Sequence, residues 1–287
     1  MSISVHSFFH KDTGTASYVV IDASHKRGVI IDSVLDLDIF SGQVGVSIAE
    51  QQLDFIKDKN IEIDWILETH AHADHLSAAA YLQTKLGAKT AIGKGIEEVQ
   101  RNFSHIFTQS MSSVDNEKVF DQLLTDGQML HFGDSQIQVM ATPGHTDDSV
   151  SYLIDNHIFV GDTLFMPDSG TARCDFPGGS ASKLWASIKR IHALPEDTNI
   201  WVCHDYQPNG REVNVQTTVL DSKLNNIHVN PGINEDDYIS MRTERDKTLS
   251  VPRLIYPSLQ VNLWSGALPA KAKNGVQYFS IPLTTNF

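Results

Sequence analysis

A short histidine-rich segment limits the possible folds and functions of this chain more than any other feature. Residues 69–75 have the sequence THAHADH and directly follow an apolar run of strand type, Ile61–Leu67. Imidazole and carboxylate groups are common ligands of zinc and non-haem iron, whereas each imidazole in a core would need partners for two polar nitrogens. We therefore interpret the segment as a metal-binding loop at the end of a strand. Its candidate ligands are His70, His72, Asp74 and His75.

Three further candidate ligands occur later in the chain, and each follows another run of strand type. They are His145, Asp162 and His204, which stand two to four residues after such runs. Loops at the carboxyl ends of strands meet over the rigid edge of a sheet, where functional groups converge. Four strand ends that each carry a ligand therefore predict one shared site.

Composition excludes several classes of function. The chain has 287 residues and a formal net charge of -13, which disfavours nonspecific binding to nucleic acid or to an anionic membrane surface. No apolar run reaches the roughly 20 residues that span a bilayer, and no signal peptide is evident. The two cysteines do not form a secreted disulfide framework. We expect a cytoplasmic protein without nucleic-acid or membrane partners, and two free thiols rather than a Cys174–Cys203 bridge.

The order of strands and helices predicts the fold class. Strand-like segments within residues 5–32 precede a helix at Ser47–Lys59, and a second helix at Leu76–Leu86 would begin just after His75. The second half repeats this outline, with strands at 136–142, 150–154, 157–161 and 199–203 and a helix at 181–194. Strands followed by helices, twice, predict an α/β fold with two packed sheets between helices, a four-layer αββα sandwich.

The candidate ligands also suggest a division of the chain. We predict a catalytic domain at residues 1–214 and a C-terminal extension at residues 215–287 that packs on the core or forms an interface. The extension contains a charged helix candidate at Asn234–Leu249 and then short segments separated by prolines. Apolar residues within 254–264 would be buried in a homodimer or against the core of the same chain.

Seven candidate ligands are more than one ion with an open coordination position needs. Spacing alone favours two ions with a bridging carboxylate, an arrangement that activates water for hydrolysis. In this grouping one ion is held by His70, His72 and His145, the other by Asp74, His75 and His204, and Asp162 is shared.

The motifs resemble those of a known family. THAHADH, Pro143-Gly144-His145, Gly161-Asp162 and His204-Asp205-Tyr206, in this order, resemble the metallo-β-lactamase superfamily. Within it, the segments GTARCDF and CHDY resemble the persulfide dioxygenases, also called sulfur dioxygenases. The likeness is greatest to a bacterial branch called β-lactamase-like hydrolase, and it continues through residues 251–283. This resemblance implies the metallo-β-lactamase fold.

The resemblance also implies a single metal. In persulfide dioxygenases only three of the seven positions bind metal, which implies one Fe(II) per chain at His70, His145 and Asp162. Two histidines and one carboxylate form the facial triad of non-haem iron oxygenases, which leaves positions for O2 and a substrate sulfur. The implied reaction oxidises glutathione persulfide with O2 and water to sulfite and glutathione, a step of sulfide detoxification. The other four residues would orient ligands or water.

Arg173 and Tyr206 are candidate substrate-binding residues. A guanidinium can hold a carboxylate bidentately, and glutathione carries two carboxylates. The Tyr206 hydroxyl could contact the same substrate. Cys174 has no identifiable base and is interpreted as a packing residue, and Asp32 as structural support below the site.

Other functions stay open at this level. The main alternative is a dinuclear zinc hydrolase of the glyoxalase II type with two Zn(II) per chain, which would cleave S-lactoylglutathione. A nuclease on the same fold is disfavoured by the acidic charge. A sulfide or metal sensor would bind its ligand without turnover. The sequence leaves the identity of the thiol carrier undecided.

Overall fold

Two six-stranded sheets form the centre of the molecule. The computed structural model describes residues 3–104, 106–107 and 119–283. The first sheet contains, in spatial order, β1 (Ile3–His10), β2 (Thr15–Asp22), β3 (Arg27–Ile31), β6 (Glu62–Leu67), β7 (Lys89–Gly93) and β8 (Gln122–Leu124). The second contains β14 (Gln216–Thr218), β13 (Asn199–Trp201), β12 (His157–Phe159), β11 (Val150–Ile154), β10 (Ser135–Ala141) and β9 (Met129–Phe132). A two-stranded ribbon, β4 (Asp36–Asp38) and β5 (Gln43–Gly45), stands apart.

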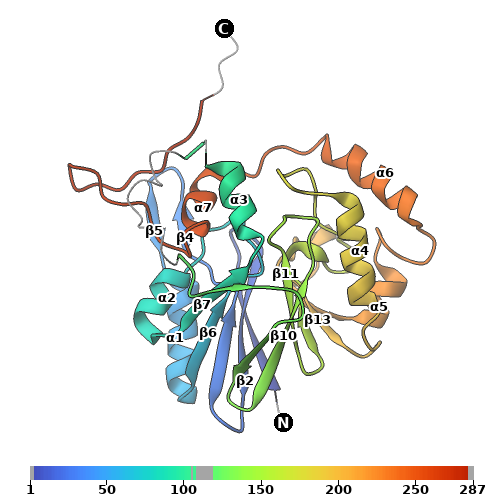
Figure 1. The fold of residues 1–287 in the computed structure, drawn as a ribbon, viewed down its shortest axis with the longest axis horizontal. Coiled ribbons are helices and arrows are strands. Elements are labelled where there is room, and N and C mark those ends of the chain that lie inside the picture. The colour runs from blue at the N-terminus through green and yellow to red at the C-terminus, as the bar shows by residue number, and fades with distance from the viewer. Residues whose placement is uncertain (1–2, 105, 108–118, 284–287) are drawn as a thin grey trace.

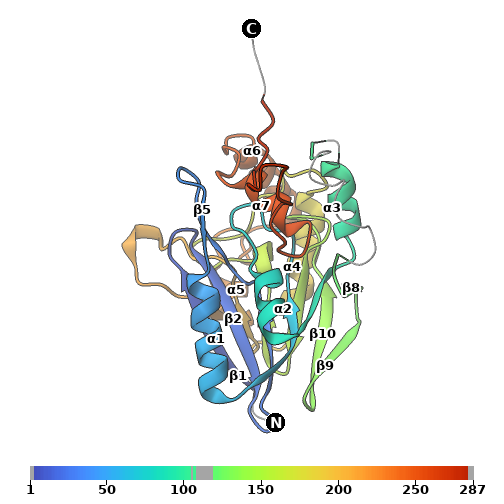
Figure 2. The same cartoon turned by 90° about the vertical axis from the view of Figure 1, so that its left-hand side faces the viewer.

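Helices cover the outer faces of both sheets. On the first sheet lie α1 (Ser47–Lys59) and α2 (Ala79–Leu86), and on the second lie α4 (Ala181–His192) and α5 (Val219–Asn225), on the opposite side of the molecule (Figure 1). The remaining helices are α3 (Ile96–Phe103), α6 (Glu235–Asp246) and α7 (Ile255–Asn262), and Figure 2 shows α7 near the top of the molecule together with α3. The predicted four-layer α/β sandwich is therefore confirmed.

Strand β2 shows how the sequence specifies these layers. All eight of its residues are buried, because one face packs on the second sheet and the other on the helices. Tyr18 and Val20 belong to the core between the sheets, whereas Val19 and Ile21 belong to the core under the helices. Successive side chains of a strand point to opposite faces. When both faces are buried, the sequence is apolar on both and shows no alternation with polar residues.

Helix α1 has the predicted bounds, Ser47–Lys59, and its N-cap is Val46. Ser47 is the first helical residue, and its hydroxyl donates to Asp36 Oδ1 at 2.6 Å. Helix α2 begins at Ala79, later than predicted, because Leu76 bridges to Leu35 as an isolated strand pair. Asp74 and His75 therefore precede the first residue of α2 by four to five positions, too far for the helix dipole to stabilise a charge on them.

The C-terminal extension is packed against the rest of the chain. Strand β14 pairs with β13 and completes the second sheet, although it lies beyond the predicted boundary at residue 214, which stays a prediction. The apolar residues of the extension are buried within this chain: Leu254, Ile255, Leu259, Val261, Leu263 and Trp264. They cover this chain's own core, and a homodimer stays a prediction. Both cysteines are buried and free, and none of the helices described is long and apolar enough to cross a membrane.

Candidate metal centre

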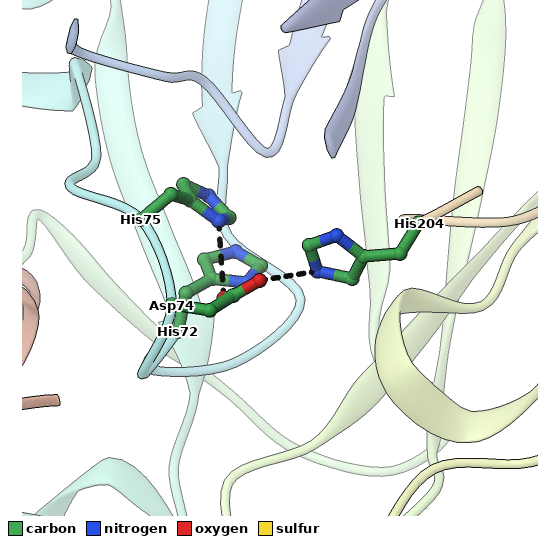
Figure 3. A group of neighbouring side chains, drawn as sticks. All are labelled: His72, Asp74, His75 and His204. Atoms are coloured by element: carbon green, nitrogen blue, oxygen red, sulfur yellow. Dashed lines mark ion pairs between the residues drawn. The ribbon is translucent and has the colours of Figure 1, made fainter. Parts of the chain in front are cut away.

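The seven candidate ligands meet between the two sheets. The loop after β6 brings His72, Asp74 and His75 from the first sheet, and His204 approaches from the second sheet (Figure 3). The short helical turn Gly161–Thr163 after β12 supplies Asp162. All of these segments follow the carboxyl ends of strands, as the sequence predicts.

Three of the ligands form a compact group. The Oδ2 atom of Asp162 lies 3.6 Å from His145 Nε2 and 3.9 Å from His70 Nε2. One ligand atom from each residue lies within 4.8 Å of the other two. These separations suit a single cation bound at about 2.0–2.2 Å from each atom.

A second group lies next to the first. Its members, with ligand atoms within 4.8 Å of one another, are His72, Asp74, His75 and His204. His204 Nε2 lies 3.2 Å from Asp74 Oδ2, an ion pair drawn in Figure 3. The same nitrogen lies 3.3 Å from Asp162 Oδ1. Asp162 therefore faces both groups, with one carboxylate oxygen toward each.

The position of His72 contradicts the two-ion grouping that spacing alone favours. Its ligand atom lies with the second group and not with that of His70 and His145. The Nε2 atom of His72 lies 3.1 Å from Asp32 Oδ1 and 3.4 Å from Glu68 Oε2. These buried carboxylates hold the ring and leave Nδ1 as the nitrogen without a hydrogen-bond partner among the described residues.

The donor atoms fit a bound cation. Buried atoms with no hydrogen-bond partner in the described part of the chain include His70 Nε2, His75 Nε2, His204 Nε2 and Asp162 Oδ1. An unsatisfied buried polar atom costs about 1–3 kcal/mol, so their convergence indicates a ligand that satisfies them together. His145 donates from Nδ1–H to the carbonyl oxygen of Arg173 at 2.8 Å, which leaves its Nε2 free for a metal.

Burial also favours the metal-binding form of two of the imidazoles, His70 and His75, whereas at His72 and His204 nearby carboxylates outweigh burial and raise the pKa well above the usual value. Burial lowers the pKa of His70 well below the usual value, and the neighbouring histidines lower it further. Burial likewise lowers the pKa of His75 to about 4. Neutral rings at physiological pH offer a nitrogen lone pair to a metal without first losing a proton.

Two carboxylates fix the main chain of the ligand loop. Asp32 accepts hydrogen bonds from Thr69 N–H at 2.7 Å and from Thr69 Oγ1 at 2.9 Å, which agrees with its predicted supporting role. Asp148 accepts a hydrogen bond from Ala71 N–H at 2.7 Å. Sequence reasoning missed Asp148, since nothing local separates it from its neighbour Asp147, which instead pairs with Lys183 at the surface.

A cavity of about 380 Å³ opens onto the first ligand group. Its lining includes His145 and Asp162, the two predicted substrate-binding residues Arg173 and Tyr206, and an apolar wall formed mainly by Phe165, Phe176, Leu249 and Pro252. The Tyr206 ring stacks on His204, with centroids 5.7 Å apart and an interplanar angle of 6°. The cavity thus joins the candidate ligands to a surface that could hold a substrate.

Three arginines, Arg173, Arg242 and Arg245, line this cavity, and Arg242 is buried and paired with Asp246. Arg173 already makes a bidentate pair with Asp175, at 2.6 Å for each bond, and donates to the Ser250 carbonyl at 2.8 Å. Its guanidinium is therefore largely occupied. Arg245 of α6 also lines the cavity and is exposed, and it has no carboxylate partner in the part of the chain that the structure describes.

Glycine is required in the Pro-Gly-His motif. Gly144 has φ +142°, and a Cβ atom there would lie 2.3 Å from the backbone nitrogen of Leu184 in α4. We expect Gly144→Ala to lower the free energy of unfolding by about 3 kcal/mol, through overpacking and backbone strain. Urea denaturation would measure this loss. In the control Gly127→Ala, φ is +74° with no atom within 4 Å, so we expect a loss of only about 1 kcal/mol; equal losses would contradict the packing argument.

Comparison with known proteins identifies the family. The profile of the Metallo-beta-lactamase superfamily matches residues 11–204, more than half of the chain. This chain belongs to the metallo-β-lactamase superfamily. The matched range contains all seven candidate ligands of the superfamily motif pattern, from the first histidine of THAHADH to His204.

Relatives in the superfamily carry different names. The chain is 45% identical to "Glyoxylase B2" of Dictyostelium discoideum over 97% of this chain and 96% of that protein. It is 45% identical to a "Beta-lactamase hydrolase-like protein" of Xylella fastidiosa, over 97% of this chain and 64% of that protein. The human "Persulfide dioxygenase ETHE1, mitochondrial" is 26% identical over 71% of this chain and 69% of that protein.

A solved structure supports the persulfide dioxygenase resemblance. The crystal structure of ETHE1 from Myxococcus xanthus matches with a TM-score of 0.73 and 26% identity, over 92% of this chain and 100% of that one. The fold and the predicted resemblance are therefore confirmed, while relatives named for hydrolases and for a dioxygenase leave the reaction to a proposal.

Proposed function

We propose that this superfamily member is a non-haem iron persulfide dioxygenase that uses one Fe(II) per chain. The group of His70, His145 and Asp162 carries the proposal. It offers two imidazoles and one carboxylate to a cation, with His72 placed outside it. A bound Fe(II) would supply the redox chemistry and the open coordination positions that O2 and a sulfur ligand require.

The proposed substrate is a small-molecule thiol persulfide, glutathione persulfide in the first instance. In the balanced reaction, glutathione persulfide, O2 and one water molecule give glutathione, sulfite and two protons. The S–S bond breaks, and the persulfide loses four electrons to O2. This reaction does not cleave a thioester, so it needs no activated water to attack a substrate carbonyl. The hydrolase alternative does need such a water.

The cavity residues would bind and orient this substrate. The phenyl rings of Phe165 and Phe176 line the cavity together with Asp162 and would limit the access of water there. Tyr206, stacked on His204, offers a hydroxyl at the same cavity. Arg173 lines the cavity, but its guanidinium is paired with Asp175 and would therefore support the wall rather than bind a substrate carboxylate.

Arg245 is the cavity guanidinium that remains available for a substrate carboxylate. We expect Arg245→Gln to raise KM for glutathione persulfide about three- to tenfold, with kcat changed less than about twofold, because an exposed charge contributes uniform binding of this size. Steady-state O2 uptake would measure both constants. The matched control is Lys247→Gln at the C-cap of the same helix. The Lys247 amine pairs with Glu244 away from the cavity, so this substitution should leave KM unchanged. Equal effects of the two substitutions would contradict the assignment.

The second candidate function is a dinuclear zinc hydrolase of the glyoxalase II type. The group of His72, Asp74, His75 and His204 favours it, because these residues could hold a second ion with Asp162 as the bridge. The high identity to a relative named "Glyoxylase B2" points in the same direction. In this arrangement S-lactoylglutathione would be the substrate.

One anaerobic preparation distinguishes the two functions. Elemental analysis gives the metal and its number per chain, and the same sample is assayed for O2 uptake with glutathione persulfide and for hydrolysis of S-lactoylglutathione. We expect one iron per chain, O2 uptake and sulfite formation. Two zinc ions per chain, with thioester hydrolysis and no O2 uptake in the iron-loaded protein, would replace the dioxygenase by the hydrolase.

A further inference from the structure

A helix from the C-terminal extension reaches the ligand loop. Helix α7 packs on α3 through Ile255, Leu259 and its C-cap Leu263, which share an apolar cluster with Ile96 and Val99. The side chain of Gln100 also donates to the Leu263 carbonyl at 2.8 Å. Figures 1 and 2 show α7 beside α3 in both views. This anchoring fixes the end of α7 at the edge of the sandwich that holds the candidate ligands.

The last residue of α7 makes three hydrogen bonds to that loop. Asn262 Nδ2 donates to the carbonyl oxygens of His72 and His75, each at 2.8 Å. Asn262 Oδ1 accepts a hydrogen bond from Ser77 N–H at 2.8 Å. Asn262 is buried, with 4% of its surface exposed. One amide thus uses both donor hydrogens and its oxygen on a six-residue stretch of main chain.

The loop needs such a partner because of its irregular conformation. Between β6 and α2 the chain forms bends and one isolated bridge, so neither a ladder nor a helix satisfies these buried carbonyl groups. To bond two carbonyl groups and one N–H at once, a side chain needs two donor hydrogens and an adjacent acceptor. The amide of Asn or Gln has these groups. Asp32 and Asp148 hold the first part of the same loop through N–H groups, and Asn262 holds the second part.

We propose that Asn262 is a positioning residue of the metal centre. From the C-terminal extension it fixes the main chain that carries His72, Asp74 and His75, and it thereby sets the geometry in which the site binds metal. The inference rests on the proposed metal centre. It also makes the extension part of the site, since removal of one side chain there would act on the main chain of candidate ligands 187 and 190 residues away.

Metal binding tests this role directly. Co(II), titrated into the metal-free protein against a competing chelator, reports affinity, and its visible absorption reports coordination geometry. We expect Asn262→Leu and Asn262→Asp to raise the Kd for Co(II) about 10- to 100-fold and to alter the absorption bands, as is common when a group that orients ligands is lost. Asn262→Asp keeps the size and the acceptor for Ser77, so it carries the test if Asn262→Leu does not fold.

Gln260 supplies the matched control. It is a buried amide on the same helix that bonds to Ser280 and Tyr256 main-chain groups, away from the ligand loop. Gln260→Leu should leave the Co(II) affinity within about threefold of wild type. Wild-type affinity and absorption in both Asn262 variants would overturn the inference alone. A wild-type protein that binds metal but consumes no O2 with persulfide would overturn the proposed reaction and leave this inference standing.

Discussion

His145→Ala is expected to remove bound iron and to lower persulfide-dependent O2 uptake by about 10³-fold or more. A catalytic metal contributes several kcal/mol of stabilisation to the transition state, and each 1.4 kcal/mol corresponds to a tenfold change in rate. Among the residues that the structure describes, only His70 and Asp162 share this group with His145, so none of them can replace it. Iron content by elemental analysis and O2 uptake with glutathione persulfide would measure both effects.

His72→Ala is the informative comparison for this result. In the one-iron arrangement His72 orients the site through Asp32 and Glu68, so we expect a loss of about 10- to 100-fold with most of the iron retained. In a two-metal arrangement His72 would be a ligand, and its loss would resemble that of His145. Equal iron loss in the two variants would therefore contradict the single facial triad and favour two metals.

The convergence of the candidate ligands was predictable because their positions depend on local pattern. Each of them follows a strand-like run, and strand ends are fixed by the same apolar periodicity that specifies the sheets. The bounds of α1 were predictable for a similar reason, since its buried residues Ile48, Ala49 and Ile56 fall at helical spacing. The start of α2 was not, because the bridge of Leu76 to Leu35 is a tertiary contact that overrides helical propensity.

The residues that hold the site were less accessible to sequence reasoning. Asp148 reaches Ala71 across 77 residues, and Asn262 reaches His72 across 190 residues. No spacing rule connects such pairs, and a buried Asp or Asn looks like its exposed neighbours in the sequence. Arg173 is a different case, since Asp175 lies only two residues later and could have indicated that the guanidinium was already engaged.

A buried ion pair in the extension gives the second large effect, on stability. Arg242 donates from Nε and Nη2 to Asp246 Oδ1, at 3.0 and 2.6 Å, and from Nη1 to the Thr171 carbonyl at 3.0 Å. The two side chains of the pair are 2% and 5% exposed. We expect Arg242→Met to lower the free energy of unfolding by about 3–5 kcal/mol, because it leaves the Asp246 carboxylate buried without a counter-charge. Urea denaturation would measure the loss.

Two controls separate the charge effect from general damage to α6. Lys247→Met removes an exposed ion pair with Glu244 on the same helix and should cost less than about 0.5 kcal/mol. The double substitution Arg242→Met with Asp246→Leu removes both buried charges and should cost less than Arg242→Met alone. If the double variant lost as much stability as Arg242→Met and Asp246→Leu lose together, an uncompensated charge would be excluded as the cause.

The same pair connects the extension to the cavity beside the candidate ligands. Asp246 Oδ2 accepts a hydrogen bond from Cys174 N–H at 2.7 Å, and Arg242 holds the Thr171 carbonyl, so α6 fixes two points of the segment that carries Arg173. Because Thr171 and Arg173 line the cavity, we expect Arg242→Met to raise KM for the persulfide together with the loss of stability. Stability lost with an unchanged KM would instead mean that the cavity wall keeps its shape without the Arg242–Asp246 pair.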